Sequence, residues 1–408
     1  MLNRQSILFS IGVLTYTVFS FITFQFNPGF AGAQADSYFY FKMFNYIKLQ
    51  QDIIPLNDYQ VATSPIFVSL IGGLQILCGS LFTEVLHFLY LCFATASIYF
   101  FVKILNSNNF FQTLPLVVLF SSSGYFIAPS IWPTSDAPAI LFAILTIYMY
   151  QRGKNLGFAT VSFLLVSTRQ NFAWLLLAFF IYDCFADMKF VKVSVRKVSK
   201  YFPALLSLLI TFNYFDGHLS TPSYLSGQLQ SSYPLPNFLN SIQIGITSIS
   251  ILGVVVLVLN RNRLTLNLRR GDFLILFGFA IFPFGFLISN SMEPIIEGLG
   301  WISLLSLQLH VSLLVISLIA SIGLALTIFL ALQNDNFRFT LPISMFASLL
   351  LSTLLMPIPF LRYFEFAVIL IASMLISDLN GKLLPIGARK YFALVVFFLS
   401  LNALKILN

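Results

Sequence analysis

Long apolar runs, separated by short loops that contain lysine and arginine, restrict the folds open to this chain. Hydrophobic residues make up 58% of its 408 residues and charged residues only 9%, whereas a soluble domain has about 25% charged residues. A fold surrounded by water cannot bury that much apolar surface. The sequence therefore predicts an all-α, multi-pass integral membrane protein.

The basic residues indicate how the chain crosses the membrane. The formal net charge of +8 comes from lysines and arginines in short loops between the apolar runs, and such loops usually lie on the cytoplasmic side. This distribution does not point to a nucleic acid partner. Three scattered cysteines, Cys78, Cys92 and Cys184, form neither a disulfide framework nor a zinc site. We therefore expect no bound metal and no cofactor.

Placing all the basic clusters in the cytoplasm gives about thirteen transmembrane helices, within a range of roughly 11–14. The predicted spans are 7–26, 84–105, 110–128, 137–151, 155–168, 171–186, 201–215, 238–259, 272–289, 309–332, 338–356, 361–378 and 391–407. The C-terminus then lies outside. Residues 64–80 are apolar but short and contain two glycines and a glutamine, so we expect them to lie along or partway into the outer leaflet.

Several predicted helices are shorter than the ~20 residues that a full crossing needs. The clearest case is the apolar stretch 155–186, which Thr168-Arg169-Gln170-Asn171 interrupts. A charged side chain at membrane depth is costly unless it faces water or a partner. This break is therefore predicted to open onto a polar cavity on the outer side, where the polar residues of the outer loops also gather.

Asp36 starts a short amphipathic segment in the first outer loop. Tyr40, Phe44 and Ile47 share one face of this segment, and a helix with such a face typically lies flat on a membrane surface. Asp36 has two interpretations, which do not exclude each other. It caps this helix, or it is a general base that removes a proton from an attacking hydroxyl.

Three more charged residues are candidates for the site. Asp136 opens a helix that continues with Ala137-Pro138, so its first interpretation is an N-cap. Arg169 and Arg362 flank strongly apolar sequence near the outer interface. Arginines there either extend to lipid headgroups or clamp a phosphate, for which their planar donors are suited. A base, two cations and an apolar groove favour a lipid-phosphate substrate.

Four short stretches, spread over most of the chain, resemble the GT-C class of membrane glycosyltransferases. They are Asp36-Ser37 with its following helix, Thr63-Ser64-Pro65, Arg169-Gln170-Asn171 with Trp174, and Arg362-Tyr363-Phe364. Within this class the chain is most similar to the dolichyl-phosphate-glucose α-1,2-glucosyltransferase family. It departs from that family in having serine rather than glutamate at position 37, only one proline in the second stretch, and a compact length.

The resemblance implies one glycosyltransferase domain, with a GT-C-like catalytic module at 1–237 and a variable helical module at 238–408. It implies that Asp36 is the catalytic base of an inverting hexose transfer and that Arg362 binds the donor phosphate. The other residues expected to bind substrate are Arg169, Gln170, Asp136 and Tyr363.

The same resemblance implies the partners of the protein. These are a polyprenyl-phosphate sugar donor, a glycan or glycolipid acceptor, and membrane lipids. The active site is expected on the non-cytoplasmic side of the membrane, which is the plasma membrane if the chain is bacterial.

Two other classes of function remain open. A lipid-linked oligosaccharide flippase or another transporter also places arginines and carboxylates at membrane depth, but the sequence holds no second copy of Arg-Gln-Asn or of the Asp36 segment. A polysaccharide polymerase acting on diphosphate-linked units would rely on cationic outer loops, and the loop 216–237 contains no lysine or arginine. A long outer loop with an amphipathic helix favours an enzyme.

Overall fold

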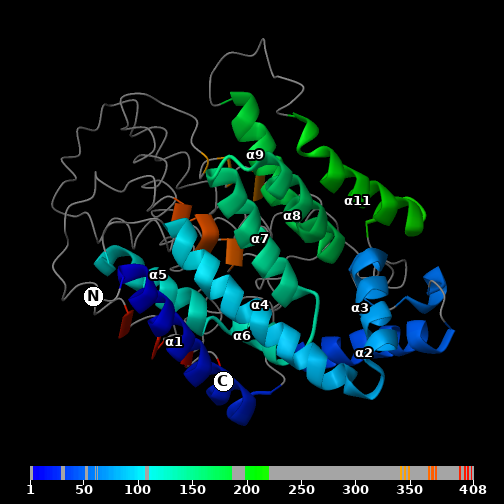
Figure 1. Ribbon diagram of the computed structural model, residues 1–408, viewed down its shortest axis with the longest axis horizontal. Helices are drawn as coiled ribbons and strands as arrows, with labels where there is room; N and C mark the ends of the chain where they lie inside the picture. The colour runs from blue at the N-terminus through cyan, green and yellow to red at the C-terminus, as the bar shows by residue number, and fades with distance from the viewer. Residues whose placement is uncertain are drawn as a thin grey trace, which may run out of the picture. The chain divides into compact units, whose positions relative to one another are not determined.

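The computed structural model describes residues 3–28, 33–50, 54–59, 61, 63–105, 110–185 and 198–219, together with isolated positions between 341 and 406. These segments form helices, short 3-10 turns and loops, and no strand occurs among them (Figure 1). The all-helical prediction is therefore confirmed for this part of the chain. Apart from the isolated positions, the spans predicted between 238 and 378 and at 391–407 lie outside the described residues.

Two described helical stretches are long and apolar enough to cross a membrane. They are α1 (Arg4–Phe26) and the stretch that runs from α3 (Pro65–Cys78) through α4 (Phe82–Leu105). A third candidate combines α5 (Phe110–Ser122) and α6 (Gly124–Ile131), which are bent by 44° relative to each other. These lengths are those expected of a membrane protein, whereas the number of about thirteen crossings stays a prediction.

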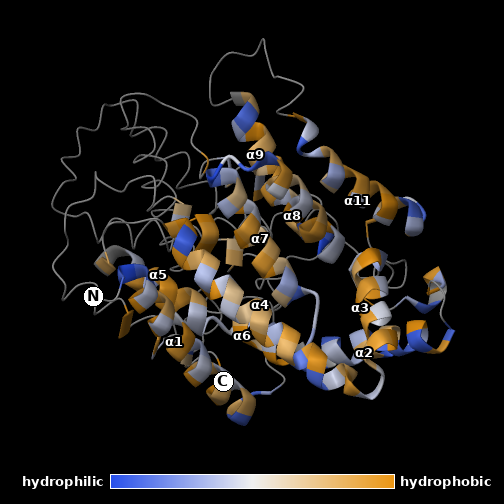
Figure 2. Ribbon diagram, in the orientation of Figure 1, coloured by the Kyte–Doolittle hydropathy of each residue, from blue (hydrophilic) through white to orange (hydrophobic). Residues whose placement is uncertain are grey.

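The surface of α1 has the character of a lipid-facing helix. Leu14, Val18 and Phe21 are 66%, 47% and 65% exposed, and apolar residues cover most of the helix (Figure 2). Exposed apolar side chains in this number are unfavourable in water but favourable in hydrocarbon. This face of α1 is therefore suited to contact lipid.

The segment 64–80 contains α3, which is followed after a short turn by α4. A 3-10 turn, η3 (Gly79–Leu81), joins the two helices, and Gly79 has a φ of +58°, which glycine adopts without strain. The 41 residues of Pro65–Leu105 would measure about 60 Å as a straight helix, twice the hydrocarbon thickness of about 30 Å. Figure 1 shows α3 turning away from the line of α4. One crossing therefore needs only α4, and the placement of α3 relative to a membrane stays a prediction.

The helix α2 (Ala33–Gln50) packs on α3 through the apolar face that the sequence predicts. Tyr40, Phe44 and Ile47 are 3%, 0% and 8% exposed. The ring of Tyr40 contacts Phe67 of α3, and the ring of Phe44 contacts Phe82 at the start of α4. This face is covered by protein, which corrects the expectation that it rests on a membrane surface.

The contact between α2 and α3 depends on the missing side chain of Gly72. A Cβ atom there would lie 2.7–2.8 Å from three side-chain atoms of Ile47. We expect Gly72→Ala to lower the free energy of unfolding by about 1–3 kcal/mol, because overpacking at a tight contact forces the backbone to shift. Thermal unfolding of the protein in detergent measures this effect.

Gly73→Ala is the matched control for this prediction. No atom lies within 4 Å of the corresponding Cβ position, and alanine is favoured over glycine in a helix by about 1 kcal/mol. This variant should be at least as stable as the wild type. Equal unfolding midpoints for the two variants would show that α2 and α3 do not pack as described.

A second group of helices surrounds α7 (Asp136–Gln151) and α8 (Asn155–Thr168). α7 packs between α4 and α8, and α8 packs between α7 and α11 (Phe202–Tyr214). α9 (Ala173–Phe185) follows α8 after a break in the helix. On the other side of α4, α1 packs against α4, α5 and α6 (Figure 1).

The two ends of α1 meet different parts of the molecule. At its basic start, Gln5 Oε1 accepts a hydrogen bond of 2.7 Å from Lys103 Nζ at the end of α4. Beyond its other end, Pro28 O accepts a hydrogen bond of 2.6 Å from Trp132 Nε1, in the loop before α7. The basic end of α4 and the start of α7 therefore lie at opposite ends of α1.

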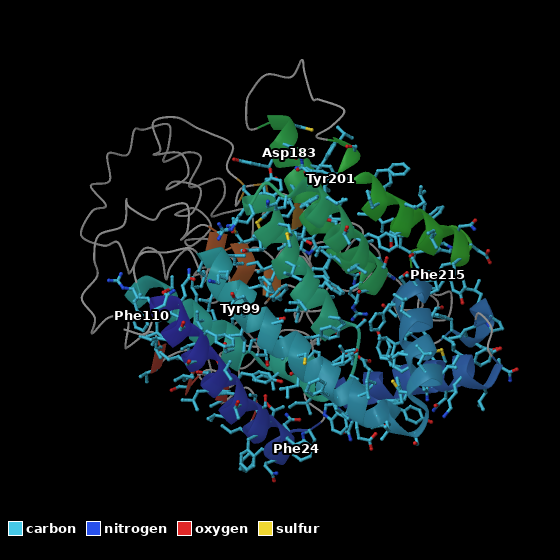
Figure 3. All side chains as sticks on the ribbon, in the orientation of Figure 1. Phe24, Tyr99, Phe110, Asp183, Tyr201 and Phe215 are labelled. Carbon is cyan, nitrogen blue, oxygen red and sulfur yellow. The ribbon has the colours of Figure 1, made fainter. Side chains whose placement is uncertain are left out.

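A buried ion pair joins the end of α9 to the residues just before α11. Lys200 Nζ lies 2.7 Å from Asp183 Oδ2, and the two side chains are 9% and 13% exposed. The hydroxyls of Tyr201 and Tyr150 donate to the same carboxylate at 2.7 and 2.6 Å. Figure 3 shows Asp183 and Tyr201 side by side, at the end of α9 and the start of α11. With all of its partners within the protein, this cluster serves to hold α7, α9 and α11 together.

The chain divides into two compact units. One unit contains Met1–Ser231 and Phe398–Asn408, and the other contains Ser232–Phe397. All the helices named above belong to the first unit, in which Asn402 Nδ2 donates a hydrogen bond of 2.8 Å to Ser122 Oγ at the bend between α5 and α6. The expected division into functional modules at residue 237 stays a prediction.

Candidate functional site

Buried polar residues from several helices meet at the end of the bundle where α7 starts, and we call this group the polar junction. It consists of Tyr40 of α2, Thr63 and Ser64 before α3, Thr134, Ser135 and Asp136 at the start of α7, Thr168, Arg169 and Gln170 between α8 and α9, and Thr211 of α11. Buried polar groups persist in proteins because they are hydrogen-bonded. The bonds within the junction therefore hold the starts of α2, α3, α7 and α9 near one another.

The strongest bond of the polar junction joins Asp136 and Arg169. Arg169 Nε donates to Asp136 Oδ1 at 2.6 Å, and Arg169 Nη2 donates to Asp136 Oδ2 at 3.2 Å. The side chains are 5% and 12% exposed. Asp136 is the first residue of α7, and its carboxylate holds the guanidinium of Arg169. The sequence suggested an N-cap here; the structure shows an interhelical ion pair.

Arg169 occupies the break that the sequence predicts. α8 ends at Thr168, Arg169 is extended with φ −149° and ψ 100°, and a 3-10 turn, η4 (Gln170–Phe172), leads into α9. Arg169 is 4% exposed. A side chain that reached lipid headgroups would be open to solvent, so the alternative of an arginine extending to the interface is wrong for Arg169.

Tyr40 connects α2 to the start of α7. Its hydroxyl lies 2.6 Å from Ser135 Oγ, next to Asp136 in the sequence. Burial raises the pKa of Tyr40 to about 12; the charge of Arg169 opposes this, and those of Asp136 and Asp36 add to it. The hydroxyl is therefore neutral at any physiological pH and holds a fixed hydrogen bond.

Thr63 and Ser64 join three helices. Thr63 Oγ1 donates to the carbonyl of Thr168 at the end of α8. Ser64 Oγ accepts from Ile66 N at 3.4 Å, which caps α3, and lies 2.9 Å from Thr211 Oγ1 of α11. Both residues are 0% exposed. The Thr63-Ser64-Pro65 stretch therefore fixes α3 against α8 and α11.

Asp36 lies in the first turn of α2, which begins at Ala33, so it is not the N-cap of that helix. Its side chain is half-buried, and Ser37 beside it is buried. Tyr40 follows four residues later and so lies on the same side of the helix. Asp36 is therefore one helical turn from Tyr40 of the polar junction, and its side chain is partly open to solvent.

Three helices, α3, α7 and α9, begin at the polar junction. Each helix start leaves backbone N–H groups without partners in the helix and has about half a positive charge. Such positions favour anions, phosphates in particular. Asp136 neutralises the charge of Arg169. The attraction for an anion therefore comes from the partial positive charge of the helix starts, together with the fixed hydrogen-bond donors of Arg169.

Comparison of the chain with protein-family models, with curated proteins and with solved structures gives no match. The residues of the polar junction and the sequence motifs that contain them are therefore the basis for assigning a function.

Four of the predicted site residues are described, and the structure brings Asp136 and Arg169 into contact. Asp136, Arg169 and Gln170 belong to the polar junction, and Asp36 is one helical turn from it. Arg362 and Tyr363 lie outside the described residues. Among the described residues no three His, Cys, Asp or Glu side chains come close enough to hold a metal ion.

Sequence reasoning did not identify Tyr40 and Thr211 as part of the site. Tyr90 of α4 donates to Thr134 O at 2.5 Å and supports the loop before Asp136. The sequence does contain one sign of such a residue, which is a tyrosine on a helix face that is otherwise apolar and rich in phenylalanine. When that face is buried, the tyrosine hydroxyl needs a polar partner. That signal marks the residue but does not identify the partner.

Proposed function

We propose that the protein is a multi-pass membrane glycosyltransferase of the GT-C class. It transfers a hexose from a polyprenyl-phosphate donor to a lipid-linked or surface-glycan acceptor on the non-cytoplasmic face of the membrane. Asp36 is the general base. Arg169 contributes to binding of the donor phosphate, and the expected role of Arg362 in that binding stays a prediction from the sequence.

The reaction is a single displacement with inversion at the sugar. The carboxylate of Asp36 takes the proton of an acceptor hydroxyl, and the oxygen forms a bond to the anomeric carbon of the donor. The bond from that carbon to the phosphate oxygen breaks, and polyprenyl phosphate leaves with the electron pair. Donors that are already in place stabilise the charge that develops on the phosphate.

The observation that supports this proposal is the position of Asp36 beside the polar junction. A half-buried carboxylate, that of Asp36, lies one helical turn from Tyr40 of the polar junction, which holds the buried Asp136–Arg169 pair at the point where α3, α7 and α9 begin. Helix starts and a fixed arginine suit a phosphate, and a partly exposed carboxylate suits proton removal from an entering acceptor. A purely structural ion pair would not require the nearby carboxylate of Asp36.

Sugar transfer by the purified protein in liposomes tests this function. The donors are polyprenyl phosphates that bear labelled glucose, mannose or galactose, and a membrane lipid extract supplies acceptors. Incorporation of label from one donor into an acceptor is the expected result. Absence of transfer from every donor, combined with rapid scrambling of the same lipids, would overturn it.

One observation favours a transporter as the second candidate. The bend of 44° between α5 and α6 lies beside the buried hydroxyls of Ser121, Ser122 and Ser123. Broken helices with polar residues at the break are typical of transporters. The scrambling measurement therefore separates the two candidates on the same liposomes.

A further inference from the structure

Among the residues that the structure describes, no donor reaches a buried hydrogen-bond acceptor of Gln170, its Oε1. The residue is 5% exposed, and its Nε2 donates to Leu219 O at 2.6 Å. This bond fixes the orientation of the amide, because a carbonyl accepts only from the nitrogen. Oε1 therefore faces away from Leu219, where it is buried without a hydrogen-bond partner.

A buried acceptor without a donor is unfavourable in the unliganded protein. Such a group gains a partner when a ligand brings a donor to it. An ionised phosphodiester has only acceptor oxygens and cannot do so. A hydroxyl can, and a hexose carries several.

We propose that Gln170 Oε1 accepts a hydrogen bond from a hydroxyl of the donor hexose and so contributes to the choice of sugar. This inference rests on the proposed function. Gln170 directly follows Arg169, and the hexose is bonded to the phosphate that Arg169 and the helix starts attract. The two neighbouring residues therefore have separate tasks: Arg169 acts on the phosphate and Gln170 acts on the sugar.

Binding of two lipids to the full-length protein in nanodiscs tests this division. The lipids are polyprenyl phosphate and the same lipid bearing glucose. Gln170→Leu should weaken binding of the glucosylated lipid by about three- to tenfold, as expected for loss of one neutral hydrogen bond. It should leave the affinity for polyprenyl phosphate unchanged, because no phosphate contact is lost.

Gln75→Leu is the matched control. Gln75 is also 5% exposed, donates through Nε2 to Asn45 at 2.6 Å, and has a buried Oε1 without a partner. It lies on α3 beside α2, outside the polar junction. Its substitution should change neither affinity.

Deoxy analogues identify the hydroxyl. If Gln170 contacts one hydroxyl, the glucosylated lipid that lacks it should bind wild type and Gln170→Leu equally well. Equal weakening of both lipids by Gln170→Leu, or no weakening, would overturn the inference while leaving the proposed function intact. Failure of the wild type to bind either lipid would instead contradict the proposed function itself.

Discussion

Asp36→Asn should lower the rate of sugar transfer by about 10²- to 10⁴-fold, the range that a general base contributes. Asparagine has almost the same shape as aspartate but cannot take the proton of the acceptor hydroxyl. The affinity for the donor should stay within about twofold, since the phosphate is held by other groups. Initial rates at saturating donor, together with donor binding to the same preparation, measure the two effects separately.

Asp58→Asn is the control for this substitution. Asp58 lies in the 3-10 turn η2 (Leu56–Asp58), between α2 and α3, and its side chain is exposed. The control variant should transfer sugar at the wild-type rate. If Asp36→Asn transferred sugar at the wild-type rate, Asp36 would have no catalytic role and would be only a structural residue of the first turn of α2. Asp136 would then be the carboxylate to test as the general base.

Asp136→Asn should destabilise the protein by about 3–5 kcal/mol, because it removes the carboxylate that pairs with the buried guanidinium of Arg169. Only 5% of the Arg169 side chain is exposed, so water cannot replace the lost carboxylate. Thermal unfolding in detergent measures the loss. Donor affinity should fall as well, because Arg169 is no longer held in place.

A double variant separates the structural role of this pair from its role in the site. Asp136→Leu combined with Arg169→Met replaces the charges with apolar groups, which commonly restores stability, but it should not restore donor binding. Asp183→Asn serves as the comparison, since it breaks the buried pair with Lys200 at the other end of the helices. That variant should lose stability and keep its donor affinity in the fraction that remains folded. If the double variant bound donor normally, the pair would have no role beyond stability.

Two features of the site could be predicted from the sequence because they are local. The break at Arg169 was visible because a charged residue interrupts an apolar run. The buried face of α2 was visible because Tyr40, Phe44 and Ile47 recur at helical spacing. The break was found where it was expected, at the 3-10 turn η4, whereas the apolar face of α2 was found packed on α3 and not on a membrane surface.

Patterns along the chain were enough to predict that the described residues are helical, that some of the helices are apolar enough for lipid, and that Asp36, Asp136 and Arg169 stand at helix starts or breaks. The pairing of Arg169 with Asp136, 33 residues earlier, and the burial of the apolar face of α2 by α3 rather than by a membrane became visible only in the packed helices. This is because periodicity and run length report the surroundings averaged along one helix. The partner of a buried polar group depends instead on which helices lie side by side, and this is settled by packing contacts such as that of Gly72 with Ile47.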